Sequence, residues 1–271
     1  MVRQAESNYG DGPVVTIGII TWQSRELLSG LLESLRDNAP RVSSEIIVVD
    51  NASTDGAIEM IESDFPKVRV IRNRENLGVA PARNTIFREA QGSYIVLLDV
   101  DTTVTVGAID TLVGVMEEHP EAAIGGPKLV YEDGSLQHSC RPFPKLIYIA
   151  MEGTFLKDWF PRNRFMREYT MADWAHDEIK KVDWMYGACL IIRKNSLEKI
   201  GLFDEKFFYL YEDVDLCFRA RKLGFDVLYI PLATVVHFLR REQKGVFHPR
   251  VGTHIKSITR YMLKNRYAII R

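Results

Sequence analysis

The chain has 271 residues and a formal net charge of −1, with 46% hydrophobic and 26% charged residues. This composition is that of a globular protein and excludes fibrous repeats and disordered chains. The longest apolar run, 14–20, is far shorter than the roughly 18 residues of a membrane-spanning helix, and the polar segment 1–13 lacks a signal-peptide pattern. Three cysteines without CxxC spacing exclude a disulfide scaffold and a cysteine-rich zinc site. We therefore expect a soluble cytoplasmic protein.

Strand and helix patterns alternate along the first 120 residues. Apolar, β-branched runs predict strands, and apolar residues at helical spacing predict helices, the first with Ser24 as its N-cap. The expected strands are 14–20, 45–49, 68–71 and 94–98, and the expected helices are 24–35, 54–62, 81–90 and 106–118. This alternation is typical of a mostly parallel sheet with helices on both faces.

The pattern changes after residue 124. The segment 139–181 has no clear period and is rich in aromatic residues, which indicates either sugar-stacking surfaces or a hydrophobic mini-core. Regular structure returns with strands at 188–192 and 227–230 and a helix at 212–223. No linker separates two independent domains.

Acidic residues follow two of the predicted strands. Asp50 follows the strand 45–49, and Asp99 and Asp101 follow the strand 94–98. Ligands of open parallel sheets bind at these carboxyl ends. If the chain stays extended there, Asp99 and Asp101 point the same way and suit a divalent cation that carries phosphate oxygens. Acidic pairs after strands also serve as helix caps, so both interpretations stay open.

Three acids, Glu212, Asp213 and Asp215, begin the helix expected at 212–223. They offset the helix dipole, and Asp215 can form a surface ion pair with Arg219. The aromatic residues around them predict a partly dry pocket instead; these are Phe207, Phe208, Tyr209 and Tyr211. A carboxylate in a dry pocket has a raised pKa and is a better general base.

Two further features have both a functional and a structural interpretation. Asn76 and Gly78 precede a helix that carries Arg83, so free amides and a guanidinium can meet an anion there, although the glycine also suits an ordinary turn. His237 lies at a predicted strand end, where it is either a structural residue or, beside the acidic pair, a metal ligand.

Taken in order, seven segments resemble the family 2 glycosyltransferases, particularly their rhamnosyltransferase-like branch. These segments are 16–21, 48–56, 76–84, 97–101, 187–193, 201–205 and 211–217. The resemblance implies the GT-A fold, a Rossmann-like α/β architecture with a mostly parallel central sheet, helices on both faces and a C-terminal acceptor-side part. It places the glycosyltransferase domain at 14–237, with a nucleotide-sugar half at 14–125 and an acceptor half at 126–237. An N-terminal tail (1–13) and a basic helical segment (238–271) flank it.

The function implied by this resemblance is inverting, metal-dependent sugar transfer in surface polysaccharide assembly. The expected donor is a nucleotide-diphosphate sugar, with rhamnose as a candidate, and the expected acceptor is a hydroxyl of a glycan or polyprenyl-linked sugar. The expected cofactor is Mg²⁺ or Mn²⁺, and no nucleic-acid partner is expected. The alternatives are an inactive nucleotide-sugar or glycan-binding protein and a haloacid-dehalogenase-type phosphohydrolase. The phosphohydrolase is disfavoured because three predicted strands precede Asp99.

The resemblance also assigns roles to single residues. Asp213 is the expected general base, and Asp101 and His237 are the expected metal ligands. The expected donor-binding residues are Thr21, Asp50, Asn76, Gly78, Arg83 and Asp99. The expected acceptor-side residues are Trp184, Glu212 and Asp215.

The C-terminal segment is strongly basic, with nine basic residues against one acidic residue from His237 onward. Lys256, Arg260 and Lys264 form a basic stripe on the expected helix. A separate apolar stripe consists of Ile255, Ile258, Met262 and Ile269. Either the helix lies in an anionic membrane surface, which would make the protein peripheral on the inner face of the cell membrane, or its apolar stripe packs on the catalytic domain.

Overall fold

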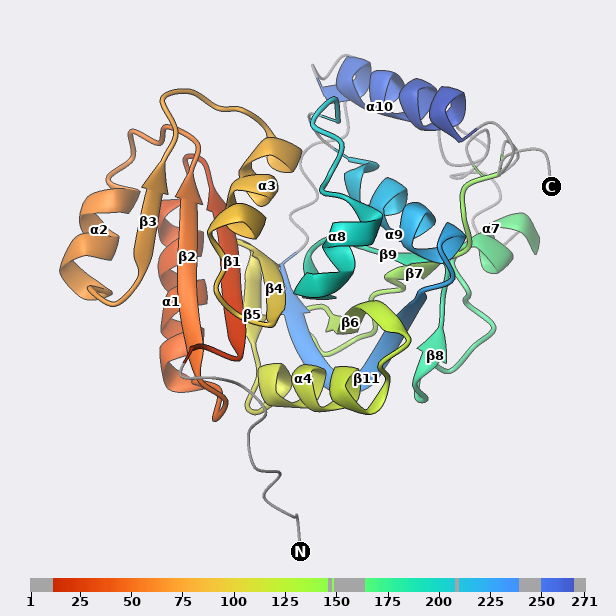
Figure 1. The fold of residues 1–271 in the computed structure, drawn as a ribbon, viewed down its shortest axis with the longest axis horizontal. Helices are drawn as coiled ribbons and strands as arrows, with labels where there is room; N and C mark the ends of the chain where they lie inside the picture. Colours follow the sequence, from red (N-terminus) through yellow and green to blue (C-terminus); the bar gives the residue numbers. More distant parts are fainter. Residues whose placement is uncertain (1–11, 146–147, 149–163, 208–209, 239–249, 266–271) are drawn as a thin grey trace, which may run out of the picture.

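The first hundred residues form the parallel part of the central sheet (Figure 1). The computed structural model describes residues 12–145, 148, 164–207, 210–238 and 250–265. Four strands of this sheet pair in parallel, namely β1 (Val15–Thr21), β2 (Ser44–Asp50), β3 (Arg69–Arg72) and β4 (Tyr94–Asp99), and a second parallel pair forms later in the chain. The helices that connect them are α1 (Arg25–Asp37), α2 (Ala57–Asp64) and α3 (Val79–Glu89). Parallel neighbouring strands need such a crossover connection, and the helices predicted from the sequence are these connections.

The rest of the chain completes a nine-stranded sheet. Along the path β3-β2-β1-β4-β10-β6-β11-β5, strand β10 runs antiparallel to β4 and β6, and β5 runs antiparallel to β11. These strands are β5 (Thr102–Val104), β6 (Ala122–Val130), β10 (Cys189–Arg193) and β11 (Asp226–His237), with β8 (Lys180–Lys181) paired to β11. A separate antiparallel pair consists of β7 (Cys140–Arg141) and β9 (Trp184–Met185). The predicted α/β architecture is confirmed.

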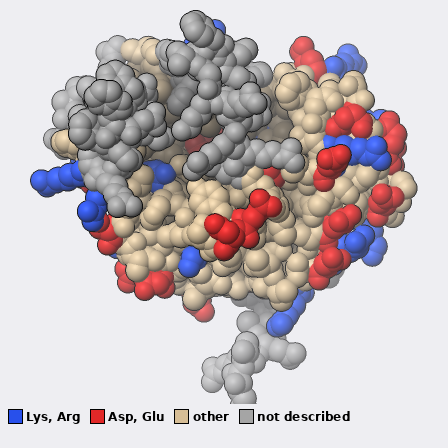
Figure 2. Space-filling model, turned by 180° about the vertical axis from the view of Figure 1, so that it is seen from behind, with Lys and Arg blue, Asp and Glu red and all other residues tan. Residues whose placement is uncertain are grey.

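The remaining helices cover the sheet or pack at its edge. They are α4 (Ala108–Glu118), α7 (Arg164–Tyr169), the 3₁₀ turn η1 (Lys194–Ser196), α8 (Leu197–Ile200), α9 (Glu212–Lys222) and α10 (Arg250–Lys264). No helix of the described ranges is long and apolar enough to cross a bilayer. On the reverse face, acidic and basic side chains of the described residues are interspersed (Figure 2).

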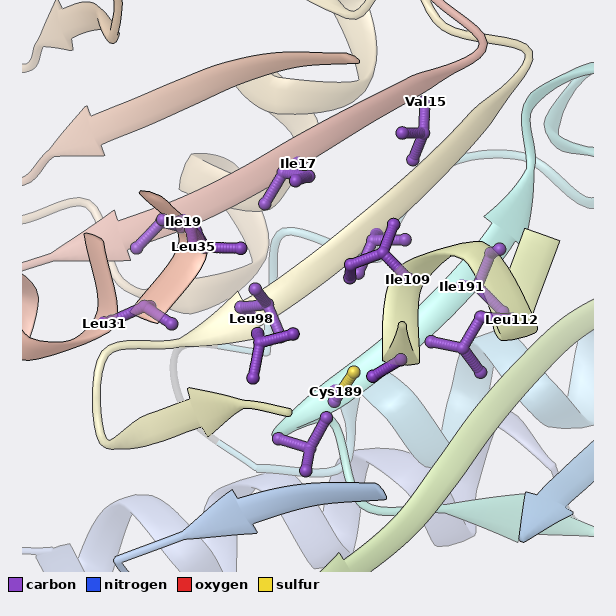
Figure 3. Packing of buried hydrophobic residues seen from close by; sticks show 14 of the residues in the cluster. Val15, Ile17, Ile19, Leu31, Leu35, Leu98, Ile109, Leu112, Cys189 and Ile191 are labelled. Carbon is purple, nitrogen blue, oxygen red and sulfur yellow. The ribbon is translucent and has the colours of Figure 1, made fainter. Parts of the chain in front are cut away.

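Alternate side chains of each strand enter two hydrophobic layers. Val15, Ile17 and Ile19 of β1 and Leu98 of β4 pack with α1, α2 and α4 (Figure 3). Leu97 points to the opposite layer, which contains α3, α8 and α9. Each large aliphatic side chain buried in this way contributes about 1.5–3 kcal/mol, and a one-residue slip would reverse the faces. The two layers therefore fix the strand register that positions the strand ends.

Two local expectations are wrong. The segment after β4 is not extended, because Val100 and Asp101 form a turn that leads the chain to β5, which pairs with the last residues of β11. The hydroxyl of Ser24 does not cap α1; it donates to the Trp22 carbonyl, and the Asp55 carboxylate accepts from the first helical amide instead.

Candidate active site

The carboxyl ends of three parallel strands bring Thr21, Asp50 and Asp99 to one edge of the sheet. Thr21 is in register with Asp50, and its neighbour Ile20 is in register with Asp99. Asp50 is buried, and its two oxygens lie 3.1 and 3.2 Å from the Ser53 amide, which donates to them. The buried Thr21 hydroxyl has no hydrogen-bond partner among the residues that the structure describes. This edge thus holds three of the residues predicted to bind the donor.

The turn that precedes α3 lies at the end of β2. The Asn76 side chain accepts a hydrogen bond from the Gly78 amide at 2.9 Å, and Asn51 donates to the Gly78 carbonyl at 3.2 Å. Gly78 has φ of 86°, a left-handed value that favours glycine. Asn76 and Gly78 therefore shape the loop beside the strand ends.

Arg83 of α3 joins the two halves of the chain. Its side chain is buried, and Nη2 donates to Asp99 Oδ1 at 2.9 Å and to the Gly187 carbonyl at 2.8 Å. Nη1 donates to Glu212 Oε1 at 3.2 Å. The structure thus places Arg83 in an ion-pair network with two carboxylates, a set of contacts that the sequence did not predict.

Asp213 lies beside this network at the start of α9. Its Oδ2 accepts from the Gly187 amide at 3.0 Å, and its Oδ1 accepts from the Val214 amide at 2.8 Å. Burial raises the pKa of Asp213, although the charge of Arg83 opposes the shift. Burial and the neighbouring Asp213 likewise raise the pKa of Glu212 against the attraction of Arg83. Glu212 is buried and Asp213 is half-buried, which agrees with the expected partly dry pocket. Phe208 and Tyr209, two of the aromatic residues behind that expectation, lie outside the described residues.

Asp215 belongs to a different network from its two acidic neighbours. It is fully buried and pairs with Arg219 at 2.9 Å and with Lys264 of α10 at 2.8 Å. The expectation that Asp215 and Arg219 form a surface pair is therefore wrong, because α10 covers that side of α9. The hydrogen bonds of Asp215 to Arg219 and Lys264 hold α9 and α10 together.

Asp101 and His237, the two expected metal ligands, lie close together. Nε2 of His237 is 3.5 Å from Oδ1 of Asp101, because β5 pairs with the end of β11. Nδ1 of His237 is 2.9 Å from Oε1 of Gln137, while the amide nitrogen of Gln137 donates to the His237 carbonyl at 2.7 Å. This amide orientation makes Nδ1 the donor, so the lone pair of Nε2 faces Asp101.

The side chains of Asp101 and His237 suit a divalent cation that also binds oxygens of a ligand. Asp101 offers carboxylate oxygens and His237 offers an imidazole nitrogen, whereas Oδ1 of Asp99 is occupied by Arg83. Within the described ranges, no group of three His, Cys, Asp or Glu side chains is arranged to hold a metal. A cation here would therefore complete its shell with water or phosphate oxygens, as Mg²⁺ typically does.

A cavity of about 930 Å³ lies beside His237. Its lining includes His237, Val100 and Thr102, together with residues of α1 and of the turn before Leu136. Asp213 and Arg83 are not part of this lining, so we do not assign the reacting centre to this cavity.

Trp184, an expected acceptor-side residue, is 7% exposed. Its indole nitrogen donates to the Pro142 carbonyl at 2.9 Å, and its ring centroid is 5.9 Å from that of Tyr186. Most of the indole is therefore packed in the small β7–β9 layer, and the half-buried Tyr186 is the more accessible ring.

Two residues of the site were missed at the sequence level. Gly187 contributes backbone groups to both Arg83 and Asp213, and such contacts leave no side-chain signal in a sequence. Gln137 orients His237 from 100 residues away, and it is held there by the pairing of Val130 with Leu136 and by a hydrogen bond from its own backbone amide to the Leu129 carbonyl.

The basic helix α10 packs on the domain. Tyr261 is fully buried and Ile258 contacts the α9 layer, whereas Arg260 and Lys264 pair with Asp204 at 2.6 and 2.9 Å. The predicted stripe of free basic residues is thus partly neutralised, which favours the packing alternative. Ile269 and the side chain of Ile255 lie outside the described residues.

Comparison with known proteins gives the family. Residues 16–200 match Glycosyl transferase family 2. The chain belongs to this family and is a glycosyltransferase.

The chain is 32% identical over 235 residues to N-acetylglucosaminyl-diphospho-decaprenol L-rhamnosyltransferase of Mycobacterium tuberculosis, covering 83% of this chain and 76% of that protein. It is 24% identical over 262 residues to rhamnosyltransferase WbbL of Escherichia coli, covering 93% of this chain and 94% of WbbL. The rhamnosyltransferase-like resemblance is confirmed.

Solved structures confirm the GT-A fold of this glycosyltransferase. GalNAc-T7 with UDP, GalNAc and Mn²⁺ gives a TM-score of 0.65 at 17% identity over 93% of this chain. The mannosyltransferase PcManGT of Pyrobaculum calidifontis, in complex with GDP-Man and Mn²⁺, gives 0.62 at 20% identity over 94% of this chain. The chain spans 48% and 64% of those two solved chains, respectively.

Proposed function

We propose that this glycosyltransferase moves a sugar from a nucleotide-diphosphate donor to an acceptor hydroxyl with inversion at the anomeric carbon. The observation that carries the proposal is the link between Asp213 and Asp99 through Arg83 and Gly187, which joins the strand ends to the start of α9. A donor at the strand ends and an acceptor at Asp213 would then meet.

In this proposal the strand edge binds the nucleotide. Thr21 and Asp50 contact the nucleoside, the Asn76–Gly78 turn borders it, and Asp99 lies near the ribose. Asp101 and His237 hold Mg²⁺ or Mn²⁺, an assignment supported by their separation of 3.5 Å and by the Mn²⁺ in both solved neighbours. The metal, when bound, neutralises the diphosphate leaving group.

Asp213 acts as the general base. Its carboxylate accepts the proton of the acceptor hydroxyl while that oxygen forms a bond to the anomeric carbon and the bond from this carbon to the diphosphate oxygen breaks. Attack on the face opposite to the leaving group inverts the anomeric carbon. Arg83 keeps Asp99 and Glu212 in place and balances their charge.

The proposed sugar is L-rhamnose, and the proposed acceptor is a sugar linked through a diphosphate to a polyprenyl lipid. Both assignments follow the names of the two rhamnosyltransferase relatives. Such an acceptor implies work at the inner face of the cell membrane. The packing of α10 offers no support for attachment through Arg260 and Lys264, since both pair with Asp204.

The test is release of nucleoside diphosphate from a panel of nucleotide sugars that includes nucleoside-diphospho-rhamnose. We expect release that requires Mg²⁺ or Mn²⁺, increases with a polyprenyl-diphosphate sugar and yields an inverted glycosidic linkage by NMR. Metal-dependent nucleotide binding without any transfer would support the inactive binding protein instead. Transfer that persists in EDTA would contradict the metal assignment.

A further inference from the structure

Arg141 of β7 is a buried cation whose partners among the described residues are all neutral. It is 6% exposed. Nη1 donates to the carbonyl oxygens of His138 and Cys140, the latter at 2.8 Å, and Nη2 donates to the Tyr186 hydroxyl at 2.7 Å. The rings of Tyr169 and Tyr186 lie against the guanidinium, with centroids 5.6 and 4.9 Å from Cζ.

The charge of Arg141 has no counter-ion among the described residues. Arg83, also buried, pairs with two carboxylates. Arg193 donates to the carbonyl oxygens of Met116 and His119 at the C-terminal end of α4, where the helix dipole is negative. Arg141 has neither kind of compensation. Because a buried charge without a counter-charge is costly, the environment of Arg141 indicates an anionic ligand.

The position of Arg141 relates it to the acceptor. Arg141 is paired with Trp184 across β7 and β9, and Tyr186 follows two residues later on the same face. The next residue, Gly187, donates to Asp213 at 3.0 Å. Arg141 therefore contacts Tyr186, the residue directly before the glycine whose amide holds the proposed base.

We propose that Arg141, oriented by Tyr186, binds a phosphoryl group of the sugar acceptor. The planar guanidinium of arginine matches phosphate oxygens in a bidentate manner. The donor diphosphate is assigned to the metal end at Asp101 and His237, which leaves Arg141 for an acceptor whose reacting sugar is linked to phosphate or diphosphate. This inference rests on the proposed function, because it needs Asp213 to mark the position of the acceptor hydroxyl.

The experiment measures binding of inorganic pyrophosphate to the full chain by calorimetry in EDTA, so that the metal end is inactive. Wild type is compared with Arg141→Gln, Arg141→Lys and Tyr186→Phe. Arg167→Gln is the matched control, because this exposed arginine of α7 already pairs with Asp173. Melting temperatures establish that each variant is folded.

We expect wild type and Arg167→Gln to bind pyrophosphate equally, Arg141→Gln to weaken binding at least tenfold, and Arg141→Lys and Tyr186→Phe to weaken it less. If Arg141→Gln does not fold, the loss in Tyr186→Phe carries the test. Absence of binding by wild type, or equal binding by all folded variants, would overturn the inference. Failure of the proposed function would be seen in a different experiment, because the protein would then release no nucleoside diphosphate in the presence of metal.

Discussion

Lys264 near the end of α10 lies 2.8 Å from Asp215 in α9, across 49 residues of sequence. Asp215 is fully buried, and α9 begins with Glu212 and Asp213. The C-terminal helix is therefore tied to the helix that carries the proposed base. Charged residues that look like a free basic stripe in the sequence are part of the packing around the site.

The contact of α10 with Asp204 predicts that the free energy of unfolding depends on pH in the acid range. Burial alone would raise the pKa of Asp204, but hydrogen bonds from Lys264 and Arg260 outweigh it and lower the pKa from 3.8 to about 2. A lowered pKa contributes stability above pH 4 that is lost as the pH falls toward 2. We expect the free energy of unfolding in urea to fall less steeply over this window in Asp204→Asn than in wild type. Identical slopes would contradict the ion-pair assignment.

Gln137 is expected to control metal affinity through His237. Gln137→Leu removes the acceptor that holds Nδ1 of the imidazole, and loss of such an orienting group typically weakens metal binding by about 10–100-fold. Mn²⁺ binding followed by electron paramagnetic resonance measures this directly, without turnover. The control is Gln91→Leu, the same change at an exposed position. Equal Mn²⁺ affinity in the two variants would contradict the role of Gln137 in orienting a metal-binding His237.

Gly187 is expected to tolerate no side chain. A Cβ atom at this position would lie 2.7 Å from Nη1 of Arg83, so Gly187→Ala must displace the guanidinium from its two carboxylates. Since a shift of about 1 Å in a site can lower the rate about 10²-fold, we expect a loss of that order in kcat. Gly114→Ala is the control, because a Cβ there meets nothing within 4 Å. Similar kcat values for both variants would contradict the role of the Arg83 network.

The pH dependence of kcat/KM is expected to reflect the buried acids. Burial raises the pKa of Asp213, and a protonated carboxyl cannot accept the acceptor proton. The rate should therefore fall on acidification at a pH above the ordinary aspartate range. Arg83 opposes the shift, so Arg83→Gln should move this fall to still higher pH. An acid limb near pH 4 in both proteins would argue against Asp213 as the base.

Periodicity and strand-end chemistry predicted much of this molecule. The alternating apolar runs located β1 to β4 because each helix must bury one face on the sheet, and Asp50 and Asp99 stand where those strands end. The sequence could not predict the turn at Val100, because the pairing of β5 with β11 causes it. It also could not predict the partners of Arg83, since Gly187 and Glu212 reach it only through tertiary packing.

The central claim is that Asp213 removes the proton of the acceptor hydroxyl during sugar transfer. The most direct measurement is single-turnover transfer by Asp213→Asn, together with its affinity for the donor nucleotide. The control is Asp37→Asn, the same change at the exposed end of α1. The account predicts a rate lowered by about 10²–10⁴-fold in Asp213→Asn, with donor affinity unchanged and the control at the wild-type rate. A wild-type transfer rate in Asp213→Asn would contradict the account.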